Sequence, residues 1–250
     1  MKTVALIQAR MTSSRLPGKV LQDIAGKPML LRVVNRVRQS QSIDFVAVIT
    51  STHESDDAIE RCCKDNGVPC FRGNLDDVLD RYYQAARHFQ AAVIVRITAD
   101  CPLLDPIIVD KVVNAFNCGS YDYASNVLEC TYPDGLDTEV VRFETLEKAW
   151  REAGLKSERE HVTAYIHKHP ELFRLYAAKH SEDLSSLRWT VDAPSDLEFV
   201  RAVYTSFSDD HFGMEDVLRF IKDHPEIAAL NTGQERNEGY MKSLKEDLCK

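Results

Sequence analysis

The order of its apolar segments is the feature that most constrains how this chain can fold. Short apolar runs of strand length, at residues 4–7, 45–49 and 92–97, alternate with longer stretches of helical periodicity. These stretches predict helices over residues 28–38, 56–65, 75–89 and 106–116. A continuous apolar run is typical of a strand buried on both faces. The alternation therefore predicts an α/β protein whose mostly parallel central sheet lies between two layers of helices.

The second half of the chain is less regular. Its patterns predict strands over 139–143, 173–177 and 187–191, and helices over 145–153, 158–168, 195–205 and 214–222. No stretch has the composition of a linker. We therefore expect one domain over residues 1–230, followed by a polar C-terminal extension over 231–250 that is extended or mobile.

Composition narrows the functional classes. The 250 residues are enough to bury a core without a disulfide or metal staple, and the seven cysteines lack zinc-like spacing, which indicates free thiols in a reducing cytoplasm. A net charge of −8 argues against nucleic-acid binding but permits an anionic small molecule at a local cationic cluster. No apolar window reaches the length of a membrane span, and the start does not resemble a signal peptide, so membrane insertion is not expected.

Polar groups follow each of the first three predicted strands. They are Gln8-Ala9-Arg10, Thr50-Ser51-Thr52 and Thr98-Ala99-Asp100. Ligands bind beyond the carboxyl ends of the strands in open parallel sheets. The sequence therefore predicts a site at this edge, with Gln8, Thr50 and Ser51 as candidates for ligand contacts.

The loop after the first strand concentrates cations and hydroxyls around Gly18. Arginine offers a planar fork for phosphate oxygens and lysine a point charge, so the loop suits a nucleoside triphosphate. The alternative is a solvated surface loop, and the pattern favours phosphate binding. The candidate residues are Gln8, Ala9, Arg10, Ser13, Ser14, Arg15 and Lys19, with Arg10, Arg15 and Lys19 as the candidates for catalysis.

Two aspartates end predicted strands. Asp100 is well placed to hold Mg²⁺ beside a polyphosphate, since that ion prefers few carboxylates plus phosphate oxygens and water, or it is a turn residue. Asp192 precedes Pro194 at the start of a predicted helix. It is either a second metal ligand or a helix cap, and the local sequence favours the cap.

Four further residues are candidates on less specific grounds. Asp137 and Glu139 follow a Pro-Asp-Gly turn on one face of a predicted strand, where they either bind acceptor hydroxyls or form a solvated edge. His161 follows a capping-box pattern on a predicted helix, which favours a structural histidine over a catalytic base. Arg72 is either a further cation for the nucleotide or a surface residue.

These motifs together resemble the sugar nucleotidyltransferase superfamily. Within it, the chain is similar to the cytidylyltransferases that make CMP-activated acidic sugars, especially the group named for spore-coat polysaccharide biosynthesis. The most specific block is IQARMTSSRLPGKVL at 7–21, and others are RITADCPLLDP at 96–106, YPDGLDTEV at 132–140 and RWTVDAPSDLEFV at 188–200. They occur in the family's order along the chain.

The resemblance implies a Rossmann-like three-layer α/β/α fold, CTP as donor, Mg²⁺ as cofactor and a homodimer. The triphosphate role in that family passes to Arg10, Ser14, Arg15 and Lys19, and the metal role to Asp100. Asp192 lies where related enzymes have V-D-T-P-E-D-L, which raises it to a second metal ligand, although Ala193 and Ser195 depart from that pattern.

The implied reaction is transfer of CMP from CTP to a sugar or acidic sugar, with release of pyrophosphate, in surface polysaccharide biosynthesis. Two alternatives stay open from the sequence. One is a glycosyltransferase that uses a nucleotide sugar, against which Asp100-Cys101-Pro102 lacks the second Asp of a D-x-D segment. The other is a nucleotide-binding module without catalytic activity.

Overall fold

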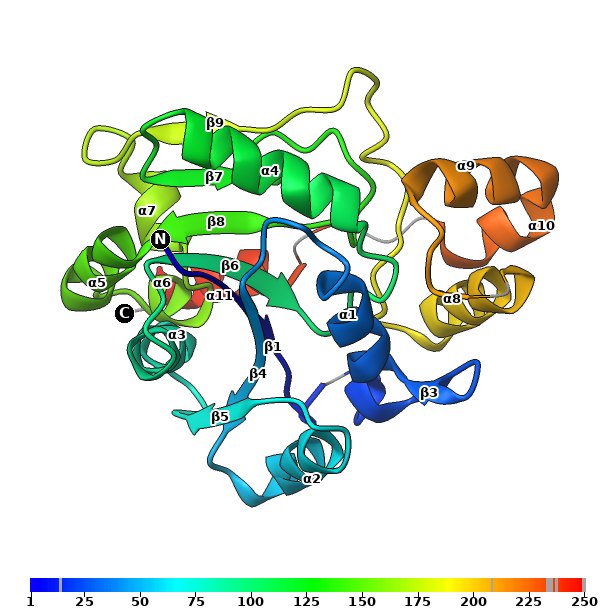
Figure 1. Ribbon diagram of the computed structural model, residues 1–250, viewed down its shortest axis with the longest axis horizontal. Helices are drawn as coiled ribbons and strands as arrows, with labels where there is room; N and C mark the ends of the chain where they lie inside the picture. Colours follow the sequence, from blue (N-terminus) through cyan, green and yellow to red (C-terminus); the bar gives the residue numbers. More distant parts are fainter. Residues whose placement is uncertain (14, 208, 233–235, 237, 249–250) are drawn as a thin grey trace.

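A central sheet organises the molecule (Figure 1). The computed structural model describes residues 1–13, 15–207, 209–232, 236 and 238–248. Within these residues the sheet has seven strands in the order β5-β4-β1-β6-β8-β7-β9. They are β1 (Thr3–Gln8), β4 (Phe45–Ser51), β5 (Cys70–Gly73), β6 (Val93–Thr98), β7 (Tyr123–Ser125), β8 (Glu139–Arg142) and β9 (Leu175–Ala177). The strands β5, β4, β1 and β6 are mutually parallel, whereas β8 pairs antiparallel with both β6 and β7.

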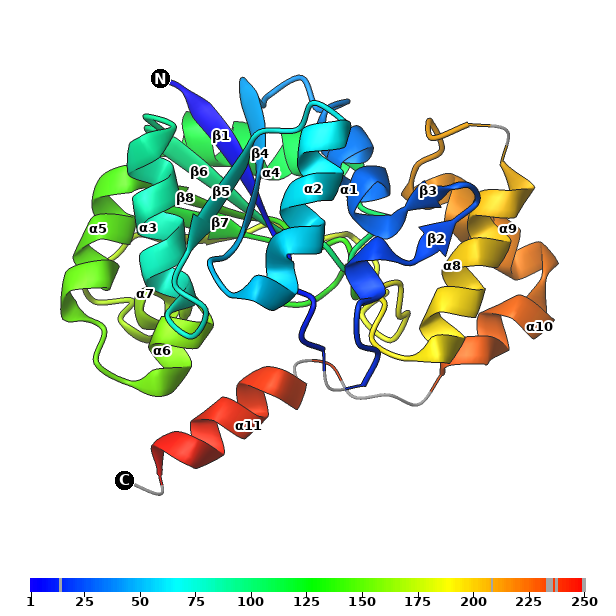
Figure 2. The ribbon, with the colours of Figure 1, turned by 90° about the horizontal axis from the view of Figure 1, so that it is seen from below.

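Helices cover both faces of the sheet, so the predicted three-layer α/β fold is confirmed (Figures 1 and 2). One face carries α1 (Met29–Val37), α2 (Asp57–Asp65) and α4 (Pro106–Cys118). The other carries α3 (Val78–His88), α5 (Phe143–Glu152) and α7 (Ala164–Lys168). Among the described residues, no helix combines the length and apolar character needed to cross a membrane.

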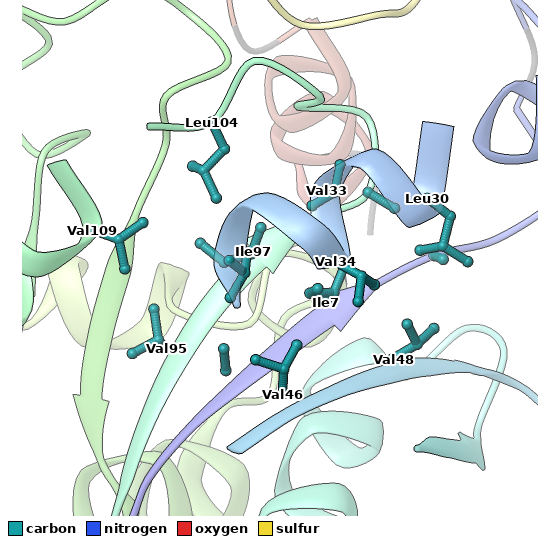
Figure 3. Close-up of a cluster of buried hydrophobic side chains, with 14 of the residues drawn as sticks. Ile7, Leu30, Val33, Val34, Val46, Val48, Val95, Ile97, Leu104 and Val109 are labelled. Carbon is teal, nitrogen blue, oxygen red and sulfur yellow. The ribbon is translucent and has the colours of Figure 1, made fainter. Parts of the chain in front are cut away.

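The buried side chains of β1 explain the two layers. Ala5 and Ile7 point into the core beneath α1, and Val4 and Leu6 point into the core beneath α3, as the two-residue period of a strand requires. All four are fully buried. Figure 3 shows Ile7 in the first of these cores, together with side chains of α1. The continuous apolar run in the sequence thus becomes the centre of the sheet.

A third apolar cluster lies beside the sheet, around Trp189. It includes side chains of α8 (Pro194–Ser206) and α9 (Met214–Asp223), with Ile24 of the short hairpin β2 (Asp23–Ile24) and β3 (Lys27–Pro28). The helix α10 (Pro225–Ala228) follows α9. The cluster holds residues 188–192 beside the end of β6. There the Val191 N–H donates to the Asp100 carbonyl over 2.8 Å.

Three sequence predictions need correction. Residues 187–191 form no strand: Arg188 makes one isolated bridge to Asp134, and the segment is held instead by the burial of its apolar side chains. The predicted helix over 158–168 is two short helices, α6 (Lys156–Glu160) and α7, because Val162 between them has a φ of 54° that an α-helix does not allow. Residues Glu238–Asp247 of the C-terminal extension form helix α11 rather than an extended segment.

Candidate active site

A cavity of about 420 Å³ opens at the carboxyl ends of β1 and β6. Its walls come from the loop after β1, the end of β6, residues 188–192 and helix α11. This is the edge of the sheet where the sequence predicted a site. Of the candidates, the cavity is lined by Gln8, Arg10, Ser13, Arg15, Lys19, Asp100, Asp137, His161 and Asp192.

Lys19 lies between the two aspartates at the floor of the cavity. Its Nζ donates to Asp100 Oδ2 over 2.7 Å, to Asp192 Oδ1 over 2.8 Å and to the Val191 carbonyl over 2.7 Å. The lysine side chain is 9% exposed. Because both carboxylates contact the same nitrogen, the structure brings together two aspartates that are 92 positions apart in sequence.

The loop that carries Lys19 turns at Gly18, whose φ of 71° lies in the left-handed region. The Gly18 N–H donates to the Met11 carbonyl over 2.9 Å, which closes the loop on itself. Asp56 fixes the beginning of the same loop by accepting from the Met11 N–H over 2.8 Å. Sequence reasoning missed this role of Asp56, since the local pattern at Asp56 indicates only the start of a helix.

The three charges at the cavity floor hold one another ionised. Burial by itself would raise the pKa of Asp100, but the attraction and hydrogen bond of Lys19 lower it to about 2. Burial likewise opposes ionisation of Asp192, and Lys19 again lowers its pKa. Burial would lower the pKa of Lys19, but Asp100 and Asp192 outweigh it and raise that pKa. At neutral pH the floor is therefore an ammonium between two carboxylates.

Arg188 orients Asp192 from behind. It donates to Asp192 Oδ2 over 2.7 Å, to Asp134 Oδ2 over 3.0 Å and to Asp196 Oδ1 over 3.1 Å. The N-cap residue of α8 is Ala193, and Asp196 in the first turn of the helix accepts through Oδ2 from the backbone N–H groups of Asp192 and Ala193, each over 2.8 Å. The capping role that the local sequence favoured for Asp192 is thus wrong, and its carboxylate is left for Lys19, Arg15 and Arg188.

Of the other candidates in the first loop, some line the cavity and one supports the loop from beneath. Arg15 lines the cavity and places Nη2 2.8 Å from Asp192 Oδ2, and Arg10 lines the cavity with an exposed side chain. Ala9 is 2% exposed and donates its N–H to the Ile49 carbonyl over 3.0 Å, so it supports the loop from beneath. Ser13 is part of the cavity wall. Ser14 lies outside the described residues.

Three candidates from neighbouring strands do not reach the cavity. Thr50 and Ser51 are fully buried, and Ser51 Oγ donates to Asp56 Oδ2 over 2.5 Å. Arg72 donates to Glu60 Oε2 over 2.8 Å and lies 2.7 Å from Asp57 Oδ1. The end of β4 therefore supports the loop after β1 through Asp56, and Thr50, Ser51 and Arg72 form no part of the cavity wall.

Of the three candidates for acceptor contacts, two line the cavity and one does not. Asp137 lines the cavity and accepts from Arg236 over 2.6 Å, and burial raises its pKa to about 6 against the attraction of Arg236. His161 also lines the cavity, and burial lowers its pKa to about 4. Glu139 is not in the wall: β8 begins at Glu139, and its carboxylate pairs with Arg96. Asp137 and Glu139 therefore do not share a solvent-facing strand face.

Two further features, one in the cavity and one behind it, were not apparent from sequence. The Oε1 atom of Gln8 is buried with no hydrogen-bond partner among the described residues, so it is available to accept a hydrogen bond from a ligand. At Gly135, φ is 111° and an added Cβ would lie 2.6 Å from the Trp189 carbonyl carbon. The Pro-Asp-Gly turn signal thus marks the close approach that lets Asp134 reach Arg188.

Comparison with known proteins identifies the family. A family model described as cytidylyltransferase matches residues 4–216. The chain belongs to the cytidylyltransferase family. Membership of this family favours nucleotidyl transfer over the glycosyltransferase alternative. It is also consistent with the cations and carboxylates that lie together at the floor of the cavity.

Individual relatives cover most of this cytidylyltransferase. It is 38% identical over 233 residues to the spore coat polysaccharide biosynthesis protein SpsF of Bacillus subtilis, covering 89% of this chain and 95% of that protein. A cytidylyltransferase structure from Leptospira borgpetersenii matches with a TM-score of 0.88 at 34% identity, covering 94% of this chain and 100% of that one. The enzyme is a CTP-dependent nucleotidyltransferase.

A more distant structure shares the fold. It is a CMP:2-keto-3-deoxy-manno-octonic acid synthetase complexed with CTP, with a TM-score of 0.65 and 21% identity, covering 82% of this chain and 99% of that one. The Rossmann-like arrangement expected from the sequence is thus confirmed by its structural neighbours.

Proposed function

We propose that this cytidylyltransferase transfers CMP from CTP to a hydroxyl of a sugar or acidic sugar, releases pyrophosphate, and acts in the biosynthesis of a surface polysaccharide. The observation that carries the proposal is Lys19 held between Asp100 and Asp192 at the floor of a cavity whose rim carries Arg10 and Arg15. Cations for a polyphosphate and carboxylates for a divalent ion lie side by side there.

In the proposed reaction the acceptor hydroxyl gives up its proton to solvent, and its oxygen attacks the α-phosphorus of CTP in line. The bond from that phosphorus to the oxygen bridging the α- and β-phosphates breaks, and pyrophosphate leaves with the bonding electrons. Such chemistry depends on positioning and on neutralising charge. Arg15 and Lys19 bind the leaving pyrophosphate, Arg10 holds the triphosphate in register, and Gln8 accepts a hydrogen bond from the nucleotide.

The floor of the cavity also suits Mg²⁺. The Lys19 ammonium marks a position for a cation that is surrounded by the oxygens of Asp100, Asp192 and the Val191 carbonyl, and oxygen is the ligand type that Mg²⁺ requires. Asp100 and Asp192 would hold the ion. When bound, Mg²⁺ would neutralise phosphate charge and lower the pKa of the acceptor hydroxyl.

The proposed class of acceptor is supported by the names of two similar proteins and by the cavity residues that have no role in binding the triphosphate. SpsF is named for spore coat polysaccharide biosynthesis, and the distant structural neighbour is named for an eight-carbon keto acid. Asp137 and His161 face the cavity and are the candidates for acceptor contacts. A homodimer, implied by the resemblance, and a cytoplasmic location, expected from the cysteine content, are further parts of the proposal.

Thermal stabilisation by each of the four nucleoside triphosphates, with and without Mg²⁺, tests the proposal. A ligand that binds only the folded state raises stability according to its concentration over its Kd. We expect the largest shift with CTP, increased by Mg²⁺, followed by pyrophosphate release when a panel of sugars and acidic sugars is supplied. Stabilisation by nucleotide sugars alone would contradict the proposal.

A further inference from the structure

The C-terminal helix forms part of the cavity wall. Helix α11 lies at the carboxyl ends of the parallel strands, below α6 in Figure 2. Four of its residues line the cavity: Glu238, Gly239, Tyr240 and Lys242. The family model ends at residue 216, so this wall is not part of the core that the model describes.

The far end of α11 is fastened to α6. Ser243 Oγ donates to Glu160 Oε2 over 2.8 Å, the Ser157 N–H donates to Asp247 Oδ1 over 3.2 Å, and Lys156 pairs with Glu246 over 2.5 Å. These contacts all lie beyond the first turn of the helix. They fix its position without involving the loop after β1.

The first residue of α11 contacts that loop. Glu238 pairs with Arg15 through Nη1, while Arg15 Nη2 contacts Asp192. The two terminal nitrogens of the guanidinium are therefore each occupied by a carboxylate. A phosphate group binds a guanidinium through the same donors, so a triphosphate and Glu238 compete for Arg15.

We propose that Glu238 sets the affinity for the nucleotide by occupying Arg15 until the triphosphate displaces it. The inference rests on the proposed role of Arg15 in binding the triphosphate. The side chains of Arg15 and Glu238 are 40% and 48% exposed, so their ion pair is weak enough for a phosphate to replace.

Displacement of Glu238 does not require the segment to leave the cavity. Arg236, two residues earlier, donates to Asp137 over 2.6 Å and lies 3.6 Å from Asp134, and its side chain is 16% exposed. The half-buried Arg236 and the contacts with α6 hold the chain before and after Glu238 in place. Rotation of one exposed side chain is enough to release Arg15.

The test is a double-mutant cycle on CTP binding, measured calorimetrically with Mg²⁺ at low ionic strength. Glu238→Gln removes the competing charge and nearly preserves the side-chain shape. We expect it to tighten the Kd for CTP about fivefold, the effect of removing one exposed ion pair. In an Arg15→Gln background the same change should alter the Kd by less than about twofold, because the two substitutions act on one contact.

Glu246→Gln is the matched control. It removes a carboxylate from the same helix at the pair with Lys156, away from the cavity, and should leave the Kd unchanged. If Glu238→Gln weakens CTP binding, or tightens it equally with and without Arg15, the inference is overturned while CTP binding stands. If the natural chain binds no CTP at all, the proposed function itself fails.

Discussion

Two groups of paired charges, one within β6 and one just beyond its end, differ in how their carboxylates are used. Within the sheet, Arg96 pairs with Glu139, whose Oε2 also accepts from Tyr123 over 2.6 Å and from Thr163. Beyond the strand, Lys19 pairs with Asp100 and Asp192. The Glu139 side chain is 6% exposed, whereas Asp100 and Asp192 are 26% and 20% exposed and face the cavity.

The difference separates stabilising charges from those available to a ligand. Both oxygens of Glu139 are satisfied inside the protein, so a ligand gains nothing from it, and removing its charge leaves Arg96 unpaired in the core. Asp100 and Asp192 share one lysine and retain access to the cavity. The same residue types therefore have opposite consequences for folding and for chemistry, and the following substitutions test this.

Asp100→Asn should have the largest effect. We expect turnover to fall about 100-fold or more, as when one group that stabilises transition-state charge is removed. The fold should persist, because Lys19 keeps Asp192 and the Val191 carbonyl as partners. Pyrophosphate release and thermal unfolding measure the two quantities. A variant that retains near-normal turnover would remove Asp100 from the catalytic centre.

Glu139→Gln is the reciprocal experiment. It should lower the free energy of unfolding by about 3 kcal/mol, because Arg96 is left as an uncompensated buried charge. Turnover per folded molecule should stay near that of the natural chain, since Glu139 does not line the cavity. Denaturant unfolding with activity measured on the same preparation checks both. Loss of activity without loss of stability would mean that Glu139 has a catalytic role and would contradict the difference between the two clusters.

Asp137 is intermediate between the two groups, because it lines the cavity yet is paired with Arg236. Burial raises its pKa from the ordinary 3.8 to about 6, so the folded state binds its proton more tightly than the unfolded state. Its contribution to stability is present below pH 3.8 and is lost as the pH rises to about 6.

Asp137→Asn removes this titration. From about pH 4 to pH 7, the unfolding free energy of the natural chain should fall by about 1 kcal/mol relative to the variant, after allowance for partial exposure. Urea unfolding of both proteins across that range measures the difference. Parallel pH profiles would mean that Arg236 keeps Asp137 ionised throughout.

Arg72→Gln should have the smallest effect. Arg72 bonds to Asp57 and Glu60, whose side chains are 43% and 51% exposed, so its loss should cost about 0.5 kcal/mol. Because Arg72 does not line the cavity, the Kd for CTP should stay the same within measurement error. A large increase in that Kd would mean that the nucleotide site extends to β5.

Most of the parallel half of the fold could be predicted because its signals are local. The apolar run of β1 and the helical period of α1 each lie within about ten residues, and α4 begins at Pro106, where Asp105 accepts from the Ile107 N–H over 2.8 Å. The alternation of Leu187, Trp189 and Val191 predicts a strand that the structure does not form. Their burial is in the third cluster, not in a sheet.

Local sequence is sufficient to predict the α/β class and the cationic loop from Arg10 to Lys19, because side-chain chemistry and periodicity are carried by neighbouring residues. Tertiary packing brings Asp192 and Asp100 to the same lysine and keeps Arg72 away from the cavity. It also places Glu238 on Arg15. Each of these contacts, or their absence, depends on where distant segments pack, and a local pattern contains no information about the far partner.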